Sequence, residues 1–460
     1  MHLALLDGEI EAVECVHAAV VLREVAGGDD GGHARERTLH PRSCESGEID
    51  TGEILTCPAY SGLVPEFPYS RLRRWPDVEA DNLQAHDATD LLLVERALAL
   101  DVPGSETVVI GDEYGAITLA LTAAGRSGVR VHQDLATGRR ALARNAEELG
   151  IGGFAPHELD ADLLAGARLV LLQLPKALAE LEEIADAVAR WAAPEVVLVA
   201  GGRVKHMSLS QNDVLARSFA HVQAQRAERK SRLLIATESL PVPESPPFPV
   251  SARHGDLVLV AHGGAFAGSR LDIGTRVLLE VLDLGGPQLR RTEVARAENE
   301  RNGAESSRSS GVVNAGRRVL DLGCGTGALA VSWARAHPRD RVVATDRSAA
   351  AVASARATAS ANGVADRVEV THDDAGSALA AGSFDTVLLN PPFHLGASVH
   401  TGAATRLFEA AARLLRPDGE LFTVYNSSLG YRAELTRLIG PTEQLRRTPK
   451  FTVTRSVRRP

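Results

Sequence analysis

The stretch Val319-Leu-Asp321-Leu-Gly323-Cys-Gly325-Thr-Gly327 decides the fold of this chain. Apolar residues run into three alternating glycines, and an alanine-rich segment follows from Ala328. The pattern predicts a buried strand, a tight loop and a helix, which is how α/β folds bring backbone close to a nucleotide-like ligand. Glycine suits such a loop because no Cβ holds the ligand away. A lone glycine loop does not identify the ligand, since nicotinamide enzymes share it.

The composition bounds the class of protein. A chain of 460 residues is too long for one ordinary core, which predicts two domains plus extensions. No apolar run reaches membrane-spanning length, and the first residues lack the features of a signal peptide, so we expect a cytoplasmic location. The four cysteines have no metal-type spacing. We therefore expect neither a disulfide framework nor a metal site.

Two successive alternations of strand and helix predict a parallel sheet in each half of the chain. In the first, strands are expected over 107–110, 169–172 and 195–200, and helices over 136–149 and 177–191. A proline-rich segment at 241–249 bounds it. We predict a weakly ordered extension over 1–63, a first domain over 64–250 and a second over 251–460, with a polar surface insertion at about 285–316.

The two alternations look like one unit written twice. Gly111-Asp-Glu113-Tyr-Gly115 falls on Gly323-Cys-Gly325-Thr-Gly327, and each stretch is followed at the same spacing by an acid, Asp134 or Asp346. In the first copy Glu113 replaces the middle glycine, which should put a bulky anion where a ligand must approach backbone. We expect two tandem Rossmann-like domains, the first degenerate and the second catalytic. Coincidental likeness of two α/β units is the alternative.

Acids at the strand ends of the second copy can each bind a different polar group of one ligand. Asp321 can accept a hydrogen bond from a cationic amino group, and Asp346 can take both hydroxyls of a ribose. Asp374-Ala375 would bind an adenine amine, although the adjacent Asp373 could serve instead. Each acid alone is more often a cap or turn residue. Their order with glycines 323, 325 and 327 and with Asn390 favours S-adenosyl-L-methionine over a dinucleotide.

The turn Asn390-Pro391-Pro392-Phe393-His394 predicts methyl transfer to a planar nitrogen. The Asn390 side-chain carbonyl and the Pro391 backbone carbonyl can hold both hydrogens of a ring amine and turn its lone pair toward the methyl group. Proline fixes the direction of that carbonyl. Phe393 can stack on the base, and His394 is a candidate substrate contact. Catalysis would be mostly positioning, without a metal, and the first copy has Gln173-Leu174 in place of Asn390-Pro391.

Several motifs together resemble those of the bacterial ribosomal RNA guanine-N2 methyltransferases. They are Phe266-Ala-Gly-Ser-Arg-Leu271-Asp272-Ile-Gly274-Thr-Arg276, the glycine loop, the Asn390 turn, Asn426-Ser-Ser-Leu-Gly430-Tyr431 and Pro449-Lys450-Phe451. The resemblance covers roughly residues 65–460, and those proteins also pair a degenerate with a catalytic domain. It implies methylation of a guanine in 23S ribosomal RNA, which the segments at 171–176 and 201–205 favour. The sister 16S ribosomal RNA enzyme shares the catalytic motifs.

The resemblance also implies the partners. S-adenosyl-L-methionine would be the methyl donor, and the substrate would be a guanine flipped out of ribosomal RNA, in a loop or single strand, free or in a subunit precursor. No membrane partner is implied. Two other classes are weighed. Protein glutamine methyltransferases use a similar turn usually followed by Tyr, and Phe393 and the duplication count against them. A non-catalytic RNA-binding assembly factor is opposed by the intact glycines and Asn390.

Basic residues gather near the end of the first alternation. They are Arg203, Lys205, Arg226, Arg229, Lys230 and Arg232. The net charge of −9 does not exclude a nucleic-acid partner, because residues 1–60 are strongly acidic and the rest of the chain is close to neutral. If these residues contact phosphates, the first domain binds RNA. The alternative is a solvated surface on a folding scaffold.

Overall fold

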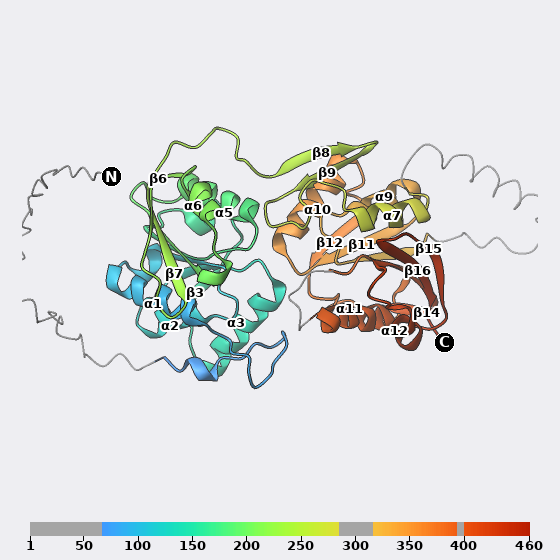
Figure 1. The fold of residues 1–460 in the computed structure, drawn as a ribbon, viewed down its shortest axis with the longest axis horizontal. Coiled ribbons are helices and arrows are strands. Elements are labelled where there is room, and N and C mark those ends of the chain that lie inside the picture. Colours follow the sequence, from blue (N-terminus) through green and yellow to red (C-terminus); the bar gives the residue numbers. More distant parts are fainter. Residues whose placement is uncertain (1–66, 285–315, 393–399) are drawn as a thin grey trace, which may run out of the picture. The chain divides into compact units, whose positions relative to one another are not determined.

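The computed structural model describes residues 67–284, 316–392 and 400–460 (Figure 1). The predicted extension over 1–63 lies outside the described residues. So do Phe393, His394 and, apart from Gly316, the predicted insertion. Within the described ranges, no helix is both long enough and apolar enough to cross a membrane.

The first half forms a mixed seven-stranded sheet in the order β3-β2-β1-β4-β5-β7-β6. Its strands are β1 (Thr107–Ile110), β2 (Val129–His132), β3 (Phe154–Pro156), β4 (Leu169–Gln173), β5 (Val197–Arg203), β6 (Phe219–Ala224) and β7 (Ser231–Ser239). Its helices are α1 (Ala88–Leu100), α2 (Ala116–Ala123), α3 (Ala136–Leu149), α4 (Ala161–Leu164), α5 (Leu178–Trp191) and α6 (Leu209–Leu215). The strand predicted over 195–200 begins two residues later, after the exposed Glu195.

The second half forms another seven-stranded sheet, in the order β12-β11-β10-β13-β14-β16-β15. Its strands are β10 (Arg318–Leu322), β11 (Arg341–Asp346), β12 (Val368–His372), β13 (Phe384–Leu389), β14 (Leu415–Asn426), β15 (Thr442–Arg447) and β16 (Phe451–Val457). Its helices are α7 (Ile273–Val281), α9 (Ala328–Ala336), α10 (Ala349–Ala361), α11 (His400–Leu414) and α12 (Arg432–Leu438). A hairpin of β8 (Val250–His254) and β9 (Leu257–Ala261) precedes them and packs on α10.

The two sheets have the same strand order, position for position, so the predicted pair of tandem Rossmann-like domains is confirmed. Each sheet has helices on both faces. In the second, α7, α9 and α10 bury apolar residues against one face and α11 and α12 against the other, as Figure 1 shows. Central parallel strands covered on both faces are rich in apolar residues, which explains the hydrophobic runs at 169–172 in β4 and 387–389 in β13. The boundary at residue 250 stays a prediction.

The strand order determines where the predicted residues meet. β10 pairs with β11 on one side and with β13 on the other, and all three run parallel. The chain leaves β10 in one direction to form β11 and β12, then crosses back to form β13. Ligands of open α/β sheets bind beside the carboxyl ends of the strands at such a reversal. Asp321, Asp346 and Asn390 therefore share one edge of the second sheet.

Candidate active site

A cavity of about 270 Å³ lies at this edge. It brings together most of the residues predicted for the cofactor and the methyl acceptor: Asp321, Gly323, Gly325, Asp346, Asp374, Ala375, Asn390, Pro391 and Pro392. Gly327 is not among its lining residues. A Cβ on Gly327 would lie 3.0 Å from the Cβ of Ala355, so this glycine allows close packing of the loop on α10.

The glycine loop leaves its backbone open toward the cavity. Gly323 and Gly325 have φ angles of 76° and 53°, and a Cβ built on either would meet no atom of the described chain within 4 Å. Both conformations are in the left-handed region that favours glycine. The loop is held from behind, because the amides of Gly323 and Cys324 donate to the carbonyl of Thr345. The space that side chains would fill is thus available to a ligand.

Asp321 carries a buried acceptor without a partner. Its Oδ2 accepts the Ala330 N–H of α9 at 2.9 Å, while its Oδ1 has no hydrogen-bond partner among the described residues. Burial raises the pKa of Asp321 to about 7, and the nearby charge of Asp346 adds to the rise. A buried carboxylate oxygen is costly unless a donor or cation meets it. Because Asp321 lines the cavity, a cationic ligand group can supply that partner.

The first copy has no equivalent free oxygen at this position. Val109 occupies the place of Asp321, and Asp112 occupies the place of Cys324. Both oxygens of Asp112 are engaged: Oδ1 accepts the Gly115 N–H, and Oδ2 accepts the N–H groups of Ile117 and Thr118 at the start of α2. The two copies therefore differ through Val109 and Asp112 as well as through Glu113.

Asp346 holds the glycine loop in place. Its Oδ2 accepts the Gly325 N–H and its Oδ1 accepts the Ser348 N–H, both at 2.9 Å. An ionised carboxylate offers about four acceptor positions, so capacity remains for ligand hydroxyls. Burial raises the pKa of Asp346. The matching acid of the first copy, Asp134, instead accepts from Ser348 Oγ and the Ala350 N–H at the start of α10.

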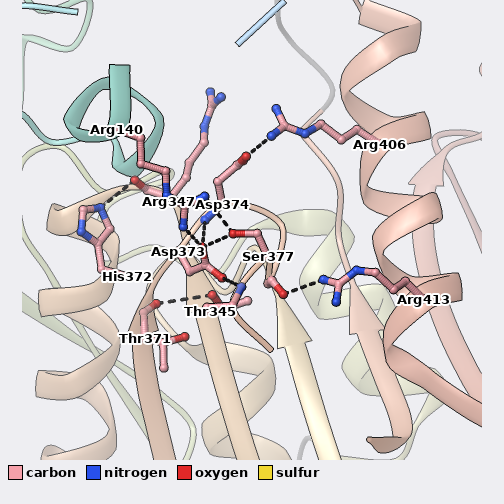
Figure 2. Close-up of polar contacts among 12 residues, drawn as sticks. Arg140, Thr345, Arg347, Thr371, His372, Asp373, Asp374, Ser377, Arg406 and Arg413 are labelled. Atoms are coloured by element: carbon pink, nitrogen blue, oxygen red, sulfur yellow. Dashed lines mark hydrogen bonds and ion pairs between the residues drawn. The ribbon is translucent and has the colours of Figure 1, made fainter. Parts of the chain in front are cut away.

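Two adjacent acids, Asp373 and Asp374, lie in a cluster of arginines (Figure 2). Asp373 accepts from the Ala378 N–H, from Ser377 and from Arg140 of α3. Although burial opposes ionisation, these hydrogen bonds lower its pKa. Asp374 pairs with Arg406 of α11, yet burial raises its pKa. Both acids line the cavity, where Asp374 has fewer partners.

Asn390 follows β13 and has one free carbonyl. Its Nδ2 donates to Asp272 Oδ2 at 3.0 Å and to Thr275 Oγ1 at 2.9 Å. Its Oδ1 is buried without a partner among the described residues. Pro391 is buried and Pro392 is exposed. Asn390 and Asp321, each with one buried oxygen that has no partner among the described residues, thus line the same cavity.

Sequence reasoning missed four residues that contact this site. They are Asp272 and Thr275, within the motif at 266–276, together with Arg140 and Arg406. The sequence does carry a signal for Asp272, because Asp directly before an apolar periodic run is typical of a helix N-terminus. The pattern does not show what the capping side chains face, since that depends on a strand more than a hundred residues away.

The basic residues of the first domain lie at the carboxyl edge of its sheet. Arg203 ends β5, and its backbone pairs with Ser231, which places the turn carrying Arg229 and Lys230 beside it. Lys205 follows in the next turn of chain and is exposed. Glu95 pairs with Arg229 at 2.7 Å, which offsets one of these charges.

The fold and the cavity define a class, the methyltransferases with a duplicated α/β domain. A model of the Methyltransferase small domain matches residues 310–455, and one of the RLMG N-terminal domain matches residues 64–240. Ribosomal RNA large subunit methyltransferase G of Pseudomonas paraeruginosa is 34% identical over 397 residues, covering 84% of this chain and 97% of the relative. The protein of that name from Streptomyces avermitilis is 34% identical over 409 residues, with the same coverage. The chain belongs to the ribosomal RNA large subunit methyltransferase G family.

A solved structure of a ribosomal RNA methyltransferase also matches this chain. The T. thermophilus 16S rRNA guanine N2 methyltransferase, in complex with AdoMet and guanosine, matches with a TM-score of 0.61 and 25% identity, over 81% of this chain and 92% of that chain. The predicted cofactor is confirmed: S-adenosyl-L-methionine is the methyl donor of this enzyme.

The raised pKa of Asp321 predicts a pH dependence of cofactor binding. Below about pH 7 the free enzyme holds this carboxyl protonated, so binding a cationic amino group must release its proton. We expect affinity for S-adenosyl-L-methionine to rise from pH 5.5 to 7, by up to about tenfold per unit. Asp321→Asn should remove most of this slope, as measured by calorimetric titration in buffers of different ionisation enthalpy.

The matched control is Asp112→Asn, which changes a buried, helix-capping acid of the first copy. It should leave the slope unchanged. The raised pKa of Asp321 also affects folding. The free wild-type protein gains stability from the protonated carboxyl, fully so below the ordinary pKa of Asp, and this stability is lost as pH rises through about 7. If the affinity of the wild type for S-adenosyl-L-methionine does not change between pH 5.5 and 7, contact between Asp321 and the amino group is contradicted.

Proposed function

We propose that this enzyme transfers a methyl group from S-adenosyl-L-methionine to the exocyclic N2 of a guanine in 23S ribosomal RNA. The observation that carries the proposal is that two residues lining one cavity each have a buried oxygen, Asp321 Oδ1 and Asn390 Oδ1, without a partner among the described residues. One suits a cationic amino group and the other suits an amine donor. The large-subunit names of the relatives at 34% identity favour 23S over 16S ribosomal RNA.

We assign the cofactor to the predicted residues. Asp321 would accept from the amino group, Asp346 would take the ribose hydroxyls, and Asp374 with Ala375 would bind the adenine. Gly323 and Gly325 would let the backbone approach, since neither position has neighbouring atoms that fill the space. When bound, S-adenosyl-L-methionine supplies an electrophilic methyl group on a sulfonium. The chain itself has only to bind, orient and exclude water.

The acceptor amine would be held by two carbonyls. A ring amine is a weak nucleophile because its lone pair is delocalised into the ring. If Asn390 Oδ1 and the Pro391 carbonyl accept its two hydrogens, the lone pair is turned out of the ring plane toward the methyl donor. The amine can lose its extra proton after transfer, so no general base is needed before it. Phe393 would stack on the base, and His394 would contact the substrate.

The substrate guanine must leave its stack to enter the cavity, so we propose a base flipped from a loop or single strand. The first domain would hold the RNA through Arg203, Lys205, Arg229 and Lys230. These residues lie at the sheet edge where α/β folds bind ligands, and three of the four are exposed. The RNA would be met free or in a precursor of the large ribosomal subunit.

Asn390→Ala tests the chemistry. It removes the free acceptor but leaves the glycine loop and the acids intact, so affinity for S-adenosyl-L-methionine should change less than about twofold. Methyl transfer should fall about 100-fold or more, in line with losses seen on removing one polar group that orients a reacting atom. Radiolabel transfer to 23S and 16S ribosomal RNA from cells lacking the enzyme gives the rate. Mass mapping of modified guanines gives the site.

The control is Gln173→Ala, which removes the amide at the end of the equivalent strand in the first copy. That variant should keep wild-type turnover. Wild-type turnover by Asn390→Ala on ribosomal RNA would contradict the amine clamp. Label confined to 16S ribosomal RNA would select the sister activity, and label in protein would select glutamine methylation.

Neutralising the first domain's basic residues tests RNA binding. Lys205→Gln with Lys230→Gln should weaken RNA binding and reduce the slope of log affinity against log salt by about one to two. Affinity for S-adenosyl-L-methionine should stay constant. Arg126→Gln with Arg168→Gln is the matched control, because these residues precede β2 and β4 and so lie at the opposite sheet edge. Filter binding gives the slope of log affinity against log salt for both double variants. Equal slopes would show that the basic residues form a solvated surface and do not contact phosphates.

A further inference from the structure

Two groups at the N-terminus of α7 hold the side-chain amide of Asn390 in one orientation. Asp272 is the N-cap residue of this helix, and its Oδ2 accepts both the Thr275 N–H and the Asn390 Nδ2 at 3.0 Å. Thr275 Oγ1 is the second acceptor of that Nδ2, at 2.9 Å. Both hydrogens of the amide nitrogen therefore have partners within the protein.

The two contacts differ in what they dictate. A carboxylate has no hydrogen to donate, so it can face only the nitrogen of the Asn390 amide and repels the oxygen. A hydroxyl can donate or accept, so Thr275 is compatible with either orientation of the amide. Its contribution is to hold the Asn390 side chain at a fixed position. Asp272 thus fixes the orientation of the amide, with its nitrogen toward the helix and its oxygen without a partner among the described residues.

The sense of this amide decides whether the proposed chemistry is possible. With Oδ1 outward, the side chain accepts a hydrogen from an incoming amine. With Nδ2 outward, two donors face each other and the amine loses one of its two acceptors. We propose that Asp272 and Thr275 are positioning residues of this enzyme, which lock the Asn390 amide with its carbonyl toward the methyl acceptor. This proposal rests on the proposed function of Asn390.

The helix terminus leaves little room for another arrangement. A Cβ on Gly274 would lie 3.1 Å from Asp272 Oδ2, 3.3 Å from Asn390 Oδ1 and 3.2 Å from a ring carbon of Phe451. Backbone thus approaches the amide directly, between the two residues that hold it. Asp272 and Thr275 also line the cavity themselves.

The first copy has a related contact, which supplies the competing explanation. Gln173 Nε2 donates to Asp90, the third residue of α1, just as Asn390 donates to the third residue of α7. Asp87 caps α1 as Asp272 caps α7. An amide that ties the helix to the sheet could therefore serve structure alone. The test needs a result that a structural tie would not give.

A double-mutant cycle with Asn390→Ala supplies that result. Thr275→Val removes one acceptor at constant volume, and Asp272→Ser removes the carboxylate but keeps a residue type that caps helices. On full-length enzyme, we expect kcat to fall about fivefold to tenfold for Thr275→Val, the usual worth of one hydrogen bond. Asp272→Ser should lose more than Thr275→Val. Thr275→Ser should restore the rate, and in the Asn390→Ala background neither change should reduce kcat further.

Asp160→Ser, which alters the cap of α4 in the first copy, is the control for a merely structural loss and should leave kcat unchanged. The melting temperature of each variant is measured alongside. Positioning is overturned if the losses of Thr275→Val and Asn390→Ala multiply, or if Thr275→Ser does not restore the rate. The cycle is run on whichever acceptor the wild type methylates. An acceptor other than guanine N2 therefore overturns the proposed function without deciding the outcome of the cycle.

Discussion

Two buried oxygens that have no partner among the described residues are the constraint on which the catalytic half depends. Leaving a buried acceptor unsatisfied costs about 1–3 kcal/mol, and the described part of the chain leaves Asp321 Oδ1 and Asn390 Oδ1 in that state on two residues that line one cavity. The rest of each group is fully engaged: Asp321 through the start of α9 and Asn390 through the start of α7. The helices thus fix these side chains so that only the unpaired atoms remain for ligands.

The duplicated fold shows how little sequence change separates a binding site from a scaffold. Both sheets have the same order, yet the first copy places Val109 where the second places Asp321. In the second copy the acid that caps the helix after the first strand is Asp321, which lies on the strand. In the first copy it is Asp112, which lies in the loop, and both its oxygens accept backbone N–H groups. Capping the helix is therefore preserved while the free acceptor is lost. The fold withstands this change because the helix N-terminus remains satisfied in both cases.

Much of this arrangement follows from sequence because it depends on periodicity and strand ends. The helix predicted over 136–149 is α3 with the same bounds, and the glycine loop, Asp346 and Asn390 lie at one sheet edge, as parallel strands require. Gly327 shows the limit: its place in cofactor binding stays a prediction, while the structure gives it packing against Ala355 of α10, which the sequence does not indicate. Which face a loop residue presents depends on helix packing. Asp272 shows the same limit for a capping side chain, whose second partner is distant in sequence.

The sequence alone left two acids, Asp373 and Asp374, as candidates for the adenine amine, and their environments distinguish them. The loop that follows Asp373 turns back to donate to it through Ala378 and Ser377, and these bonds lower its pKa against the effect of burial. Asp373 therefore stabilises the conformation of the loop that follows it. Among the described residues Asp374 receives no such backbone bonds. Its charge is opposed by burial and balanced chiefly by Arg406, and the residue lines the cavity. A carboxylate with spare lone pairs suits a ligand amine better than one already saturated, so we propose Asp374 for that contact.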